Sequence, residues 1–175
     1  WLIVPGFGIA AAAAWWFAQM SPQVGRWQLA GPLLLRGLMM LFVVLPVANI
    51  TFRSFEAEAF AHGYRLKNLV RQLAISFATA SAISLQQHRV ALHETRLAET
   101  ASVTNATFMQ SLDQLTRGFS AAGHAVGEAH AMALASLSRL LQQQATFMAS
   151  LDGFHVMAIV ALLAGVFAAW QKEID

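Results

Sequence analysis

Long blocks without charge alternate with polar segments along the chain, and the blocks are long enough to be membrane-spanning helices. The first block covers residues 1–25, and the second, residues 27–52, contains Arg36 as its one charge. About 20 apolar helical residues cross a hydrocarbon layer of about 30 Å. The two blocks therefore predict transmembrane helices, separated by a turn in which Pro22 and Gly25 interrupt the helix.

Two further blocks predict two more spanning helices. A polar connector, residues 53–71, leads to residues 72–88, which carry no Lys, Arg, Asp or Glu but are rich in Ser, Thr and Ala. That block can cross a bilayer only with its flanks included, and its small residues suit close helix packing. Residues 153–171 form the last apolar block. We therefore expect an all-α membrane protein with three spanning helices in residues 1–86 and a fourth in residues 152–175.

Residues 87–151 are too polar to span a membrane and contain two amphipathic stripes. Residues of one face recur every three or four positions, as Phe108, Leu112, Leu115 and Phe119 in the first stripe and as Ala133, Leu137, Leu140, Gln144, Phe147 and Leu151 in the second, where Gln144 is the one polar member. This period is typical of amphipathic helices. We expect a long extracytoplasmic helical hairpin that continues the third and fourth spanning helices.

Composition agrees with membrane embedding. The chain of 175 residues is 57% hydrophobic and 11% charged, whereas soluble domains carry about 25% charged residues. The absence of cysteine excludes disulfides and thiolate metal sites. A net charge of +2 gives no basis for nucleic-acid binding.

The basic residues predict an orientation. Four Lys or Arg in the connector 53–71 indicate that it is cytoplasmic, and Lys172 after the last helix agrees. We therefore expect a multi-pass protein of the cell inner membrane with both chain ends in the cytoplasm. Because the sequence begins with Trp1, we interpret it as the C-terminal fragment of a longer protein.

Polar residues inside the second and third blocks are the candidates for a substrate pathway. Arg36 is an ionised group inside a spanning helix, which is costly unless water or a partner meets it. Gln72, Ser76 and Thr79 recur at steps of four and three and share one helix face, and Asn49 lies one turn after Pro46. The alternatives are an arginine that reaches the interface and polar side chains that bond neighbouring helices.

No residue pattern indicates catalysis, so we expect no enzyme activity and no cofactor. The sequence has no nucleophile elbow, no phosphate-binding loop and no paired carboxylates. His124 and Glu128 are four positions apart with His130 close by, but no third ligand has a fixed spacing, so we interpret the histidines as solvated loop residues and not as a metal site. Asp152, just before Gly153, is interpreted as a helix N-cap; the alternative is an outward carboxylate that takes up protons.

Several segments in order resemble a known transporter family. They are GPLLLRGLMMLFVVLP at residues 31–46, KNLVRQLAISFATA at 67–80, the pattern R-x3-H-x3-L of Arg89, His93 and Leu97, and QQQATFMASLDGF at 142–154. As a set they resemble the C-terminal end of the fourteen-helix drug:proton antiporters of the EmrB/QacA type, a branch of the major facilitator superfamily. One departure is that Ala74, Ile75 and Ala78 stand where the family usually has glycine.

The resemblance implies the last four of fourteen helices of a proton-coupled multidrug efflux transporter. Such a protein exports small hydrophobic or amphiphilic compounds by alternating access. It further implies that the rest of the transporter precedes Trp1, and that a periplasmic adaptor and an outer-membrane channel are partners in Gram-negative relatives.

A membrane-anchored sensor or scaffold that presents an extracytoplasmic helical hairpin is the alternative from another functional class. Simple anchors have no need for Arg36, Asn49 or the Gln72 face, so the polarity inside the second and third blocks favours the transporter.

Overall fold

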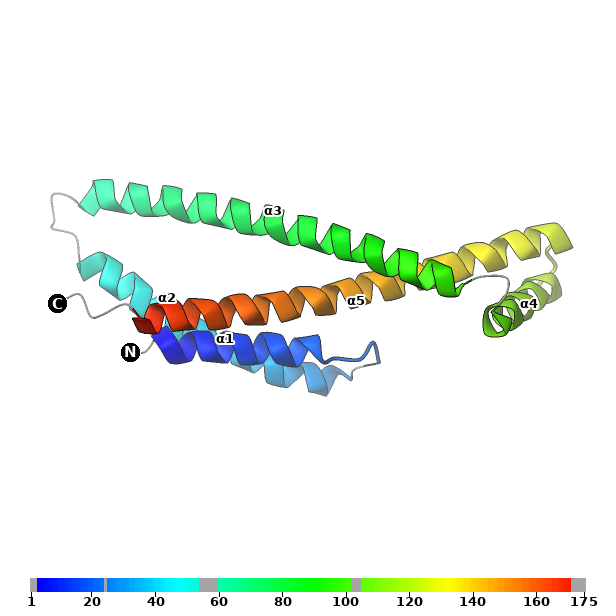
Figure 1. The fold of residues 1–175 in the computed structure, drawn as a ribbon, viewed down its shortest axis with the longest axis horizontal. Helices are drawn as coiled ribbons and strands as arrows, with labels where there is room; N and C mark the ends of the chain where they lie inside the picture. The colour runs from blue at the N-terminus through cyan, green and yellow to red at the C-terminus, as the bar shows by residue number, and fades with distance from the viewer. Residues whose placement is uncertain (1–2, 24, 54–59, 102–104, 171–175) are drawn as a thin grey trace. The chain divides into compact units, whose positions relative to one another are not determined.

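The computed structural model describes residues 3–23, 25–53, 60–101 and 105–170, and within these ranges its regular structure is entirely α-helical. The helices are α1 (Ile3–Ala18), α2 (Arg26–Arg53), α3 (Phe60–Thr100), α4 (Ala106–Ala121) and α5 (Val126–Trp170) (Figure 1). The all-α class expected from the sequence is confirmed.

The chain forms two compact units. The first unit comprises Trp1–Ser84 and Ser150–Asp175, and the second comprises Leu85–Ala149. The two long helices α3 and α5 each contribute to both units. The boundaries expected between spanning and extracytoplasmic segments at residues 86/87 and 151/152, and the membrane placement of each segment, remain predictions.

Two of the described helices are long and apolar enough to cross a membrane. They are α2, over Trp27–Asn49, and α5. Only 6% and 11% of their most apolar stretches are buried, so neither is a core helix wrapped by the rest of the chain. With 16 residues, α1 is apolar but shorter, at about 24 Å. The association of this chain with a membrane is supported by these two helices. The expected four membrane-spanning helices remain a prediction.

Small residues bring α1 close to α2 and α5 in the first unit. A methyl group added at Gly6 would lie 2.6 Å from Val43 Cγ2, and one at Gly31 would lie 2.9 Å from the Trp16 ring. A methyl group added at Gly165 of α5 would likewise lie 3.1 Å from Phe7 Cβ on α1. Glycine at such points lets helix backbones approach where a side chain would separate them.

The second unit is built around α4 and the first part of α5. Asn105 caps α4, because its side-chain oxygen accepts hydrogen bonds from the backbone N–H groups of Thr107 (3.0 Å) and Phe108 (3.4 Å). The turn to α5 contains Gly123 at φ +98°, a left-handed conformation that glycine adopts without strain. Buried Leu112 anchors α4.

The structure fixes two helix boundaries, and one of them shows that the expected N-cap at Asp152 is wrong. Helix α3 begins at Phe60, so residues 60–71 of the predicted connector are helical and continue into the third block without a break. Helix α5 runs through Asp152 and Gly153, so Asp152 is not an N-cap. A single glycine costs about 1 kcal/mol in a helix, which a helix with strong formers on both sides tolerates. Connector residues 54–59 and Lys172 lie outside the described residues.

Candidate functional site: exposed polar faces and two grooves

Arg36 and Asn49, the candidates on α2, both have exposed side chains. They are 13 positions apart, which places them about 140° from each other around a helix of 3.6 residues per turn. The two residues therefore do not share one face of α2. A single passage bordered by α2 can include one of them along its wall, but not both.

The α3 candidates do share a face. Gln72, Ser76 and Thr79 lie in the continuous helix α3, and all three side chains are exposed. Within the described part of the chain, no hydrogen bond or ion pair joins this stripe to Arg36 or Asn49. The structure thus keeps the stripe that the sequence predicted, but it does not gather all five candidates into one site.

The segment of α3 that carries the stripe is exposed on every side. All residues from 68 to 84 are exposed, including Leu73 (71%) and Phe77 (77%). Large apolar side chains are unfavourable in water when they form a continuous patch, and a polar stripe is unfavourable against hydrocarbon. This segment therefore has two faces that require two different surroundings.

A groove of about 590 Å³ lies between α1 and α5 in the first unit. Its lining includes the small residues Gly8, Ala11 and Ala12 on α1 and Ala158 on α5. Trp15, Trp16 and Gln19 line one end, and Leu162 completes the lining on α5. The two indoles are about half exposed, at 53% and 49%.

Aromatic contacts fix how α1 and α5 meet beside this groove. Trp15 meets His155 edge-to-face with ring centroids 5.3 Å apart, and Phe17 stacks on Phe154 at 5.1 Å. The Nδ1–H of His155 donates to the Leu151 carbonyl, 3.0 Å away, one turn earlier in α5. The imidazole is thereby held in place by its own helix and by the indole of α1.

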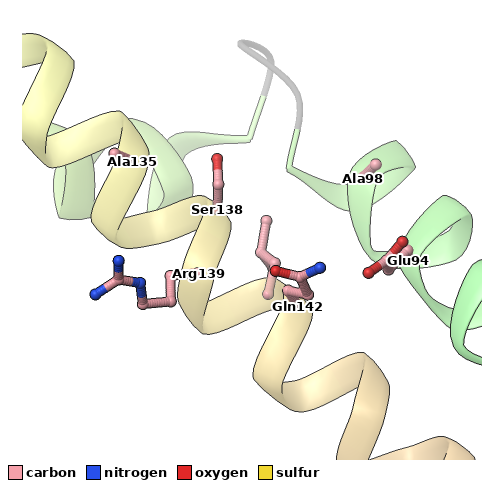
Figure 2. A pocket seen from close by; sticks show the side chains of 7 residues that line it. Glu94, Ala98, Ala135, Ser138, Arg139 and Gln142 are labelled. Atoms are coloured by element: carbon pink, nitrogen blue, oxygen red, sulfur yellow. The ribbon is translucent and has the colours of Figure 1, made fainter.

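A second groove, of about 530 Å³, lies between α3 and α5 in the second unit. Figure 2 shows Glu94 and Ala98 of α3 across a gap from Ser138 and Gln142 of α5. Arg139 extends from α5 on the side away from Glu94 (Figure 2). The two charges thus do not close the groove with an ion pair.

Charged pairs on the second unit are solvent-exposed. Arg117 donates to the carboxylate of Asp113 one turn earlier in α4. This hydrogen bond, with the positive charge of Arg117, lowers the pKa of Asp113 below its usual value. His124 Nδ1 lies 3.5 Å from a Glu128 carboxylate oxygen. Among the described residues, no group of three or more His, Asp or Glu is arranged to hold a metal ion.

The pairing of α1 with α5 was missed by sequence reasoning. Trp15 and Trp16 lie near the end of the first apolar block of the sequence. Nothing in the pattern connects them with His155 or Ala158, which follow well over a hundred residues later. The one usable signal was the shared richness of both segments in Gly and Ala, which permits a close approach but does not specify a partner.

No protein family, curated protein or solved structure matches this chain.

Proposed function

We propose that this chain is the C-terminal part of a proton-coupled multidrug efflux transporter of the major facilitator type, which exports hydrophobic or amphiphilic compounds by alternating access. The proposal combines the resemblance of residues 31–46, 67–80 and 142–154 with the membrane-like composition of α2 and α5. The chain then supplies helices to a larger bundle whose remainder precedes Trp1.

The observation that carries the proposal is the two-sided exposure of α3. Its segment 68–84 presents the polar stripe of Gln72, Ser76 and Thr79 and, around the rest of the helix, large side chains such as Phe77. A helix that only anchors a protein in lipid has no use for the stripe. A helix that borders a wet pathway on one side and lipid or other helices on the other needs both faces.

In this proposal the protein is a multi-pass protein of the cell inner membrane with both chain ends in the cytoplasm. The basic residues of α3 near its start, including Arg65, Lys67 and Arg71, then lie at the cytoplasmic surface. The second unit lies outside, on the periplasmic side. Reporter fusions at residues 57 and 123 test this orientation, and a cytoplasmic reporter at 123 would contradict it.

Drug susceptibility of cells that carry the full-length protein tests the pathway. We expect Gln72→Ala and Arg36→Ala to lower resistance to amphiphilic drugs and to raise intracellular dye accumulation. Gln110→Ala removes the same side chain at an exposed position of α4 and is the matched control. Unchanged resistance in both variants, with normal amounts in the membrane, would return these residues to a packing role.

A periplasmic adaptor that passes substrate to an outer-membrane channel is part of the proposal in a Gram-negative host. In this proposal, the adaptor docks on the surface of the second unit. Leu137, half-buried on α5, offers a probe: Leu137→Asp is expected to impair export while leaving membrane insertion intact. Normal export by that variant at normal expression would remove this surface from the mechanism.

A membrane-anchored sensor or scaffold is a second candidate, and the compactness of the second unit favours it. Leu85–Ala149 forms a unit with its own buried residues, Leu112, Ala129 and Ala133. A module that presents a binding surface outside the membrane has this construction. In a sensor or scaffold, the polar stripe on α3 would have no role in transport. Loss of drug resistance in the Gln72→Ala variant would therefore speak against this second candidate.

A further inference from the structure

We infer that the groove between α1 and α5 holds one acyl chain of a membrane phospholipid, with the glycerol end of that lipid at Trp15, Trp16 and Gln19. This inference rests on the membrane placement in the proposed function and does not depend on drug export. It assigns a ligand to the first unit that the export mechanism does not use.

The length of the groove is comparable to the depth of one leaflet. From Gly8 to Trp16, the α1 part of its wall extends about 12 Å at a rise of 1.5 Å per residue, and Gln19 follows just beyond the end of the helix. One leaflet of a hydrocarbon layer of about 30 Å is about 15 Å deep. The α1 wall and Gln19 therefore cover about the depth that a single extended acyl chain occupies in one leaflet, with Ala158 and Leu162 of α5 on the opposite side.

The lining changes in polarity along that length. Gly8, Ala11, Ala12 and Leu162 offer no hydrogen-bonding side chain, and the small residues leave room for a chain of methylene groups. The other end has the indole N–H groups of the tryptophans and the amide of Gln19. Indoles favour the level where hydrocarbon meets headgroups, because one part of the ring system is apolar and the N–H seeks a partner.

The indole end of the groove is rigidly supported. Trp15 is braced edge-to-face by His155, whose Nδ1 is held by the Leu151 carbonyl. Trp16 packs against Gly31 of α2, where an added methyl group would lie 2.9 Å from the ring. Both indoles are still about half exposed. The polar end is thus fixed before a ligand arrives, which lowers the entropy cost of binding.

A helix from another part of the protein is the competing occupant. An α-helix is about 10 Å wide with its side chains, whereas Gly8, Ala11, Ala12 and Ala158 line the groove between two helices already in contact through Phe17 and Phe154. A linear chain fills such a groove along its whole length. A helix would cover the groove and leave its floor unfilled.

Quenching of tryptophan fluorescence by brominated phosphatidylcholine tests the inference in the full-length protein. One background keeps only Trp15 and Trp16, and a reference keeps only Trp27, which is 91% exposed on α2 and does not line the groove. Every other tryptophan is replaced by phenylalanine. Brominated lipid is titrated into lipid-depleted protein in detergent. The maximal quenching of each tryptophan background is then measured in vesicles reconstituted from the same lipid.

Half-maximal quenching of Trp15 and Trp16 is expected at a lipid-to-detergent ratio about tenfold lower than for Trp27, as about 1.4 kcal/mol of preferential binding would give. Ala12→Phe fills the groove at an exposed position and should abolish the difference. Val160→Phe, at an exposed position of α5 outside the lining, is the matched control and should leave it unchanged. Ala12→Leu repeats the test with a smaller side chain.

The remaining outcomes separate two failures. Equal ratios for both backgrounds, or a difference that persists in folded Ala12→Phe and Ala12→Leu protein, would overturn the lipid site. So would unquenched Trp15 and Trp16 beside a quenched Trp27, because protein would then cover the groove. If no tryptophan is quenched even in vesicles, the membrane placement itself fails, and with it the proposed function.

Discussion

The two units of this chain bury their apolar surface in different ways. In the first unit, α1 meets α2 and α5 through glycine and alanine, while large apolar side chains such as Leu163 and Phe167 remain 64% exposed. In the second unit, α4 is capped by Asn105, anchored by Leu112 and carries an ion pair on its exposed face. The first arrangement suits a hydrocarbon solvent, and the second suits water.

In the proposed membrane placement, the continuous helix α5 lies in two solvents. Helix α5 crosses from one unit to the other at Ala149 and Ser150 without a break. Its first part contributes the buried residues Ala129, Ala133 and Ala145 of the second unit, and its last part carries exposed Val, Leu and Phe. Backbone hydrogen bonds are satisfied within a helix in both environments, so only the side chains need to change.

The largest effect is expected at the centre of the second unit. Leu112 is 6% exposed, and Leu112→Ala should cost about 3 kcal/mol through lost burial and a residual cavity. Amide hydrogen exchange in α4 should then accelerate by about 100-fold, while the first unit keeps its protection. Met109→Ala, 42% exposed on the same helix, is the control and should change exchange little. Equal effects of both variants on amide exchange would mean that Leu112 does not belong to a buried apolar core.

The corresponding change in the first unit is an added side chain at a glycine contact. Gly6→Leu places atoms where Val43 Cγ2 lies 2.6 Å from an added methyl group, and we expect a loss of about 2 kcal/mol from overpacking. Thermal unfolding in detergent, followed by circular dichroism, measures it. Gly37→Leu adds the same group where nothing lies within 4 Å. If both variants unfold at the parent temperature, the close α1–α2 approach is not present in solution.

A smaller effect is expected from the helix cap. Asn105→Ala removes the acceptor for the N–H groups of Thr107 and Phe108 and should destabilise α4 by about 1 kcal/mol. Exchange of the first-turn amides of α4 reports the loss. Asn105→Asp keeps an acceptor oxygen and should retain the protection, so loss in both variants would assign Asn105 a role other than capping.

The smallest effect is the pH dependence of the pair Asp113 and Arg117. Because the hydrogen bond from Arg117 lowers the pKa of Asp113 in the folded state, the pair stabilises α4 above the unfolded-state pKa of about 4. That stability is lost as the pH falls through the lower folded-state pKa. Helicity and exchange of α4 between pH 7 and pH 2 measure it, and Asp113→Asn should remove this component. If α4 became more stable as the pH fell from 7 to 2, the contribution of this pair to stability would have the opposite sign from that expected.

The sequence predicted the local elements well where the pattern was strong. The stripe from Phe108 to Phe119 lies on α4, and the turn marked by Pro22 and Gly25 separates α1 from α2. It failed at Asp152, where a polar residue before glycine resembles a cap, and it did not specify that the polar connector is helical from residue 60. In both cases the helix continues because its neighbours are helix formers and tertiary packing or solvent accepts the polar side chains.

The candidate site was predictable only within single helices. The shared face of Gln72, Ser76 and Thr79 follows from helical period alone, and the structure keeps it. The different faces of Arg36 and Asn49 follow from the same period once α2 is known to be continuous through Pro46. The groove at Trp15 and Ala158 joins residues from opposite ends of the chain, which no local pattern encodes.

The sequence by itself determined that the chain is helical, where its apolar blocks lie and which polar residues share a helix face, because these depend on periodicity and composition. The tertiary structure decided that α1 packs against both α2 and α5, that Trp15 rests on His155, and that a groove runs beside them. Such contacts depend on how closely particular backbones approach. Glycine and alanine residues allow this close approach, but the sequence does not show which helix each of them will contact. Their partners are defined only when the helices pack.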